Sequence, residues 1–185
     1  MKKEKKSALF GGSFDPVHLG HIQIAKKALN FADEVIIMPN YLNPLKHSFS
    51  APPNLRYKWL KKVFKNFKNI KVSTWETEKQ RPVYSIETIK HFRPDFFIIG
   101  SDNLKGLDKW YKIDEILNLT EFIVATRGEV DKNLLKKYNI TKLIEIDITI
   151  SSTEIRNCNF KYIPKEIEKE IKEFYGQNCK NKRVT

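Results

Sequence analysis

The most regular feature of the chain is an alternation of short apolar runs with segments whose apolar residues recur at helical spacing. The apolar runs are bounded by Gly, Pro, Asn or charged residues, as buried strands usually are. These runs predict strands at residues 7–12, 34–38, 70–73, 95–100, 121–126 and 142–146. The helically spaced segments predict helices at residues 19–30, 55–67, 84–92, 104–117, 132–138 and 164–175.

This alternation predicts an α/β fold: a central parallel sheet with helices on both faces. The length of 185 residues fits a single domain over residues 1–185, with a polar and basic segment at 176–185 that we expect to be a flexible tail. Residues 40–54 show neither pattern, and loops of this length inside a domain are usually functional. In such sheets, ligands collect at the carboxyl ends of the strands.

Charge and composition limit the classes of partner. Lys and Arg outnumber Asp and Glu by 34 to 22, a formal net charge of +12, which favours nucleic acid, a membrane surface or phosphorylated metabolites. No apolar run approaches the roughly 18 residues that a membrane span needs. The basic residues 2–6 precede glycine and aspartate rather than an apolar signal core. We therefore expect a cytoplasmic protein without a membrane partner.

The chain has only two cysteines, Cys158 and Cys179. They form no CxxC motif and have no cluster of histidines beside them. This usage predicts neither a disulfide nor a structural zinc site, and we expect both thiols to have no catalytic role.

The densest group of chemically active residues follows the first strand, in the segment GGSFDPVHLGH at residues 11–21. His18 and His21 lie one helical turn apart, after the glycine turn Gly11–Gly12. A strand-to-helix junction of this kind offers free backbone N–H groups, a helix N-terminus and two imidazoles, which together suit phosphate. The segment is neither GxGxxG nor a P-loop, and it lacks the further ligands of a zinc site. Taken alone, two such histidines can also be ordinary polar surface.

A second candidate anion site is ISSTEIR at residues 150–156, with hydroxyls at a helix start and Arg156 one turn later. Either Ser152 or Thr153 could instead simply cap that helix. Asp102 follows a buried strand ending in Gly100 and can accept from ribose hydroxyls or act as a helix cap. Trp110 can stack on a flat ring or belong to the core, and Lys46 on the long loop can reach phosphate or be solvated.

Together these segments resemble the signature of the HxGH nucleotidyltransferase superfamily and, more narrowly, the bacterial nicotinate-nucleotide adenylyltransferases. The likeness runs from Leu9 to about Tyr175. It rests on the two anion motifs, on Pro39-Asn40 with Pro44-x-Lys46, on PVYSIET at residues 82–88, and on IGSDNL at residues 99–104 followed by Trp110. The resemblance implies a Rossmann-like nucleotidyltransferase fold that joins the AMP part of ATP to nicotinate mononucleotide and releases pyrophosphate.

The resemblance also implies a role for each matching residue. His18, His21, Arg156 and Lys46 would bind phosphates and stabilise charge on the reacting group. Residues implied to bind ATP are Gly11, Gly12, Ser13, Phe14, Gly100, Asp102, Ser152 and Thr153. Residues implied to bind the mononucleotide are Asn40, Tyr84, Ser85 and Trp110, with Trp110 stacked on the pyridine ring. Mg²⁺ would be carried on the ATP phosphates, and no protein metal ligands are implied.

The mononucleotide phosphate is already an anion, so its attack on the α-phosphorus needs no activating base, only alignment and charge stabilisation. Each histidine, with a reference pKa of about 6.5, can gain a proton beside phosphate. The chain departs from the family pattern at Leu45, Val83 and Ser85, and at residues 127–130, where the loop differs. Nicotinamide mononucleotide and 4′-phosphopantetheine remain alternative acceptors. A nucleic-acid-binding protein is a remote alternative, since the lysines are not interleaved with aromatics in a recognisable module.

Overall fold

The computed structural model describes residues 5–44 and 47–181. Its centre is a six-stranded sheet in the order β3-β2-β1-β4-β5-β6, in which every neighbouring pair is parallel. The doubly wound nucleotide-binding folds share this strand order. The strands are β1 (Ser7–Gly12), β2 (Glu34–Pro39), β3 (Ile70–Val72), β4 (Phe96–Gly100), β5 (Glu121–Thr126) and β6 (Lys142–Glu145). The Rossmann-like α/β prediction is confirmed.

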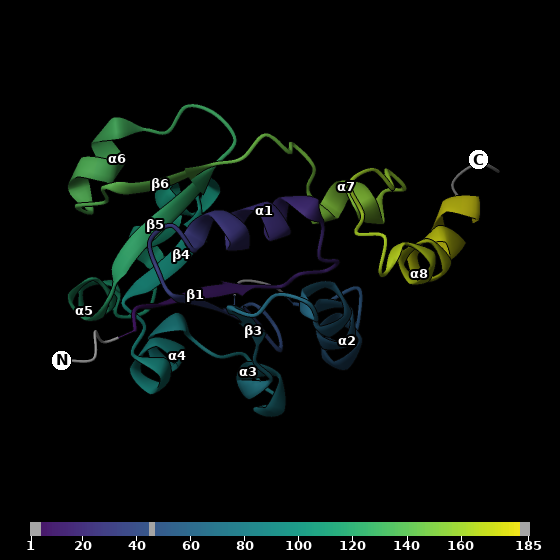
Figure 1. Ribbon diagram of the computed structural model, residues 1–185, viewed down its shortest axis with the longest axis horizontal. Coiled ribbons are helices and arrows are strands. Elements are labelled where there is room, and N and C mark those ends of the chain that lie inside the picture. Colours follow the sequence, from purple (N-terminus) through teal and green to yellow (C-terminus); the bar gives the residue numbers. More distant parts are fainter. Residues whose placement is uncertain (1–4, 45–46, 182–185) are drawn as a thin grey trace.

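Helices cover both faces of the sheet (Figure 1). They are α1 (Leu19–Ala28), α2 (Pro53–Phe64), α3 (Trp75–Glu78), α4 (Ser85–Phe92), the 3₁₀ helix η1 (Ser101–Lys109), α5 (Ile113–Leu119), α6 (Lys132–Lys137), α7 (Ser152–Arg156) and α8 (Glu168–Asn181). Strand side chains alternate between two buried clusters, so that Phe10 packs with α1, α2 and α8, whereas Leu9 packs with α4, η1 and α5. Nearly every central strand residue is therefore buried, which is why these strands appear in the sequence as continuous apolar runs.

Three elements differ from the expectation. The helix expected at residues 104–117 is instead η1 followed by α5, because the chain turns at Lys112, which has a left-handed φ of 58°. The short helix α3 was not expected. The last helix begins at Glu168 rather than at residue 164 and continues to Asn181, so the first residues of the expected tail are helical.

The expectation that the two cysteines form no disulfide is wrong. Cys158 and Cys179 form a disulfide with their Cα atoms 5.9 Å apart, joining the turn after α7 to the last helix. Their separation of 21 residues in the sequence does not indicate that the two cysteines are close in the fold. The pairing arises because α8 packs back against the core through Ile171 and Tyr175, which brings its last turns near α7.

Candidate active site

The candidate site lies where the carboxyl ends of the strands meet. The register pairs Gly12 of β1 with Pro39 of β2, and the backbone N–H of Asn40 donates to the Gly12 carbonyl at 3.0 Å. On the other side of β1, strand β4 ends at Gly100. These parallel ends therefore bring the glycine turn, Asn40 and the Gly100–Asp102 segment to one edge of the sheet.

The two histidines form a stacked pair at the start of α1. His18 is the N-cap residue, and its backbone N–H donates to Nδ1 of His21 at 3.2 Å. The ring centroids are 3.7 Å apart, with the planes inclined by 27°. A Cβ on Gly20 would lie 3.0 Å from the His18 ring, so a side chain there would require the ring to shift by a few tenths of an ångström.

Burial makes both imidazoles neutral in the protein alone. Desolvation, reinforced by the positive charge of Arg127, lowers the pKa of His18 to about 3. Desolvation also lowers the pKa of His21 well below 6.5, with further contributions from His18 and Arg127. Because Nδ1 of His21 accepts a hydrogen bond, its proton belongs on Nε2. A cationic histidine near neutral pH, as the sequence analysis suggested, therefore requires the field of a bound polyanion to reverse a large shift.

Nδ1 of His18 is buried and has no hydrogen-bond partner among the described residues. An unpaired buried polar atom is costly. It marks His18 as a residue whose hydrogen bonding is incomplete without a ligand.

The Phe14 side chain packs against the stacked pair of His18 and His21. Its side chain is only 2 % exposed and contacts His21 edge-on, with the ring centroids 4.9 Å apart. Its backbone has a left-handed φ of 47°, and a Cβ on Gly12 would lie 3.3 Å from its ring. The expectation that Phe14 binds ATP is thus limited to its backbone, because its ring is enclosed in the core.

Helix α7 places the second anion motif directly on the first. Ser152 Oγ donates to the Pro16 carbonyl at 2.9 Å. Arg156 donates through Nη1 to the Asp15 carbonyl at 2.5 Å and through Nη2 to Thr153 Oγ1 at 2.8 Å. Segments far apart in the sequence are therefore hydrogen-bonded to each other beside the histidines, and α7 lies next to the start of α1 (Figure 1).

Capping at α7 differs in detail from the expectation. Ser151, not Ser152 or Thr153, is the N-cap: its Oγ accepts from the Glu154 N–H at 3.2 Å, and Glu154 accepts from the Ser151 N–H at 2.8 Å. Because Ser151 is the cap, the Ser152 hydroxyl can donate to the Pro16 carbonyl and the Thr153 hydroxyl can accept from Arg156.

The residues expected to bind the mononucleotide lie at the ends of neighbouring strands and at the starts of helices. Tyr84 is 47 % exposed just before α4, which begins at Ser85, and its ring centroid lies 5.0 Å from that of Tyr111. Trp110 is half-buried and packs edge-on against Phe97, with the centroids 6.1 Å apart. Tyr84 and Trp110 therefore each pack against another aromatic ring and keep part of their surface accessible to solvent.

Asn40, also expected to bind the mononucleotide, and Asp102, expected to bind the adenosine ribose of ATP, follow strands β2 and β4. Asn40 is 9 % exposed, and its Oδ1 has no partner among the described residues. Asp102 is exposed in the first turn of η1, within 3.4 Å of the Asn103 amide. Lys46 lies outside the described residues, so its expected role has no structural counterpart here.

A hollow of about 240 Å³ connects several of these groups. Its lining includes Ser13, Asn40, Arg56 and Arg156. The lining contains two arginines, which suit an anionic group, and also the carboxylate of Asp15.

Two arginines escaped the sequence analysis as site residues. Arg127 follows β5 directly, and its charge lowers the pKa of both histidines, which places it near them. Its position after a central strand was the available signal. Arg56 is 1 % exposed and donates to three backbone carbonyls around the site, but in the sequence it is one basic residue in a lysine-rich helix.

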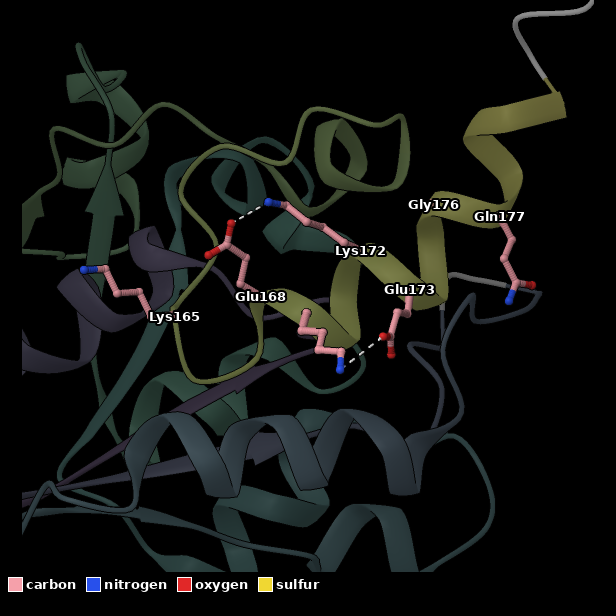
Figure 2. A pocket seen from close by; sticks show the side chains of 7 residues that line it. Lys165, Glu168, Lys172, Glu173, Gly176 and Gln177 are labelled. Carbon is pink, nitrogen blue, oxygen red and sulfur yellow. Dashed lines mark hydrogen bonds and ion pairs between the residues drawn. The ribbon is translucent and has the colours of Figure 1, made fainter.

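A larger hollow, about 710 Å³, lies along α8 (Figure 2). Its charged side chains are largely paired with each other, Lys172 with Glu168 and Lys169 with Glu173. The described residues that line it include no aromatic ring.

The described residues contain no group of three or more His, Cys, Asp or Glu side chains arranged as metal ligands. Within the same residues, no helix is long and apolar enough to cross a membrane.

Comparisons with known proteins agree with this architecture. A family model described as cytidylyltransferase-like matches residues 9–158. A protein of a Nitratiruptor species named "Probable nicotinate-nucleotide adenylyltransferase" is 46% identical over 179 residues, covering 92% of this chain and 98% of its own. A protein of the same name from Aliarcobacter butzleri is 42% identical, covering 90% of this chain and 94% of its own.

Among solved structures, the nicotinic acid mononucleotide adenylyltransferase of Plasmodium falciparum complexed with NaAD has the same fold. Its TM-score is 0.73 at 22% identity, and the match covers 95% of this chain and 96% of that one. From its fold, its paired anion motifs and relatives that match nearly its whole length, this chain belongs to the nicotinate-nucleotide adenylyltransferases of the cytidylyltransferase-like family.

Proposed function

We propose that this protein transfers the AMP part of ATP to the phosphate of nicotinate mononucleotide, giving nicotinate adenine dinucleotide and pyrophosphate for NAD biosynthesis. One observation carries the proposal. The Ser152–Arg156 helix is hydrogen-bonded to Asp15 and Pro16, which lie immediately before the stacked pair of His18 and His21. A substrate with several adjacent phosphates can contact both groups at once.

The chemistry follows from this arrangement. The mononucleotide phosphate attacks the α-phosphorus of ATP, a new P–O bond forms, and the bond to the pyrophosphate oxygen breaks in line with it. Nε2 of His21 can donate to an oxygen that gains charge, and Arg156 can stabilise the leaving pyrophosphate. Neutral imidazole donors already serve this purpose, because a preorganised hydrogen bond in a water-poor site stabilises developing charge.

Substrate binding is divided between the strand ends. We assign the β- and γ-phosphates to Ser152, Thr153 and Arg156, and the adenosine ribose to Asp102. We assign the pyridine ring to the accessible surfaces of Trp110 and Tyr84, with Ser85 and Asn40 beside it. Lys46 would reach the phosphates from the long loop.

The metal we propose is Mg²⁺ bound to ATP as part of the substrate. The carboxylate of Asp15, the acidic group nearest the histidines in sequence, is buried and already accepts three hydrogen bonds within the protein. The site therefore offers cations and N–H donors to a substrate that brings its own magnesium. We propose the cytoplasm as the location, because ATP is an intracellular metabolite, and no nucleic-acid or membrane partner.

The test is pyrophosphate release with ATP and Mg²⁺ and three acceptors: nicotinate mononucleotide, nicotinamide mononucleotide and 4′-phosphopantetheine. We expect strong preference for the first. Preference for either of the others would retain the ATP site and overturn the acceptor assignment. His18→Ala and His21→Ala should abolish turnover in folded protein, and a double-digit percentage of the wild-type rate in either variant would overturn the site.

A further inference from the structure

The Asp15 side chain lies in the phosphate-binding turn but faces the protein interior. It is 6 % exposed. Its Oδ2 accepts from the Ser50 N–H at 2.9 Å, and its Oδ1 accepts from the Ala51 N–H at 3.0 Å. Asp15 thus holds the end of the long loop rather than a substrate atom, whereas its own carbonyl accepts from Arg156 at 2.5 Å.

The third hydrogen bond to this carboxylate comes from the far end of the chain. Tyr175 Oη, on α8, donates to Asp15 Oδ1 at 2.5 Å. The Tyr175 ring is 2 % exposed and packs against Trp59, with the centroids 6.1 Å apart. Burial and the neighbouring carboxylate raise the pKa of Tyr175, so the hydroxyl stays protonated and remains a donor throughout the physiological pH range.

Arg56 connects the residues around Asp15 with the long loop. Its guanidinium donates to the carbonyls of Ser13 at 2.6 Å, Tyr41 at 2.8 Å and Ala51 at 3.0 Å. Its charge also interacts favourably with that of Asp15, although burial still lowers the Arg56 pKa. The turn, the long loop and α8 are therefore joined around one buried carboxylate.

We propose that Tyr175 is a positioning residue for the reaction: its hydroxyl orients the Asp15 carboxylate and, through the Asp15 backbone, the Arg156 guanidinium that binds the phosphates. This inference rests on the proposed function. It makes the last helix part of the machinery that shapes the ATP site, although no atom of that helix is assigned to substrate.

Tyr175→Phe tests the proposal most directly, because it removes the hydroxyl and keeps the buried ring. We expect kcat to fall about tenfold and KM for ATP to rise several-fold, since small displacements of aligned groups are costly in rate. KM for nicotinate mononucleotide should change less, and the thermal midpoint should stay within a few degrees of wild type. The matched control is Tyr162→Phe, whose ring is 47 % exposed, and its kinetics should equal those of wild type.

The route through Asp15 is tested by a double-mutant cycle with Asp15→Asn. If Tyr175 acts through Asp15, the combined variant loses less activity than the product of the two single losses. Fully multiplicative losses, or Tyr175→Phe kinetics within twofold of wild type, would overturn the proposal. If Asp15→Asn does not fold, the kinetics of Tyr175→Phe test the proposal alone: it requires that kcat falls and that KM for ATP rises more than KM for nicotinate mononucleotide.

Calorimetric titration with ATP alone separates this inference from the proposed function. Weaker ATP binding by Tyr175→Phe than by Tyr162→Phe supports the positioning role even if the wild-type enzyme does not use nicotinate mononucleotide as a substrate. Equal ATP binding by the two variants would overturn it even if wild-type turnover is normal.

Discussion

Gly20 and His18 are so close that a methyl group on Gly20 would lie 3.0 Å from both Cε1 and Nδ1 of the His18 ring. The glycine therefore does more than begin a helix. It provides the space in which the His18 ring stacks on His21. In the segment from His18 to His21, the size of the residue at position 20 therefore affects how the two rings pack.

Gly20→Ala should therefore damage catalysis more than stability. The added Cβ displaces the His18 ring, and we expect kcat to fall by between about ten- and a hundredfold. Gly106→Ala is the matched control, because a Cβ there meets nothing within 4 Å. Steady-state kinetics and thermal unfolding of both variants check this. Equal kcat values for the two would show that the stacked pair tolerates displacement.

The buried histidines should make the fold less stable in acid. The pKa of His18 is lowered from 6.5 to about 3, and that of His21 is also lowered. Between these values the unfolded chain binds more protons than the folded one. The contribution to stability is complete above about pH 6.5 and is lost as the pH falls, by at most about 1.4 kcal/mol per pH unit for each histidine.

Denaturant unfolding of wild type and His18→Gln at several values from about pH 4 to 7.5 measures this effect. The variant should lose less stability on acidification than wild type. His91→Gln, which removes an exposed imidazole, should follow wild type. Parallel curves for wild type and His18→Gln would contradict the lowered pKa.

The buried Glu76 should make the fold less stable as the pH rises, which is the opposite of the effect of the histidines. It is 7 % exposed, accepts from Thr88 Oγ1 at 2.6 Å, and burial raises its pKa from 4.5 to about 7. Its contribution is complete below about pH 4.5 and is lost as the pH rises through about 7, because ionisation leaves a charge in the core. Glu76→Gln keeps an acceptor for Thr88 and removes the charge.

We therefore expect Glu76→Gln to gain stability relative to wild type between about pH 4.5 and 7, by up to about 1.4 kcal/mol per pH unit. Above this window the gain should level off. Glu78→Gln is the control, since Glu78 also accepts from a threonine, Thr74, but is exposed. A pH-independent difference between Glu76→Gln and wild type would refute the assignment.

Reduction of the disulfide should lower thermal stability. Its loop of 21 residues corresponds to about 3 kcal/mol in the chain-entropy treatment, or a decrease of several degrees in Tm. Calorimetry with and without a dithiol reductant measures the shift. The Cys158→Ser/Cys179→Ser double variant should start at the lower Tm and be insensitive to reductant. An unchanged Tm after complete reduction would contradict this account.

Apolar runs predicted all six strands. The signal is strongest for the central strands, which are buried on both faces, whereas the edge strands β3 and β6 also carry exposed residues. The periodicity also placed the segment with the two histidines directly after β1, where the structure has it. It could not separate η1 from α5, because the break at Lys112 depends on a left-handed backbone conformation without the glycine that usually signals it. Nor could it find the disulfide or Arg56, whose partners are backbone carbonyls brought close only by tertiary packing.

The site residues were named by motif, but their interdependence was not visible in the sequence. The hydrogen bond from Arg156 to Asp15 joins residues 141 positions apart, and the burial of Asn40 Oδ1 likewise depends on the folded structure. Phe14 shows the same limit: its place within the motif suggested substrate contact, but its ring is part of the core.

The bond from Ser152 to Pro16 spans 136 positions of the chain and has a consequence for biosynthesis. A ribosome synthesises the histidine turn long before the Ser152 segment, so this hydrogen bond can form only after residue 152 has been made. A chain interrupted before that point carries the histidines without the segment that the folded protein places beside them.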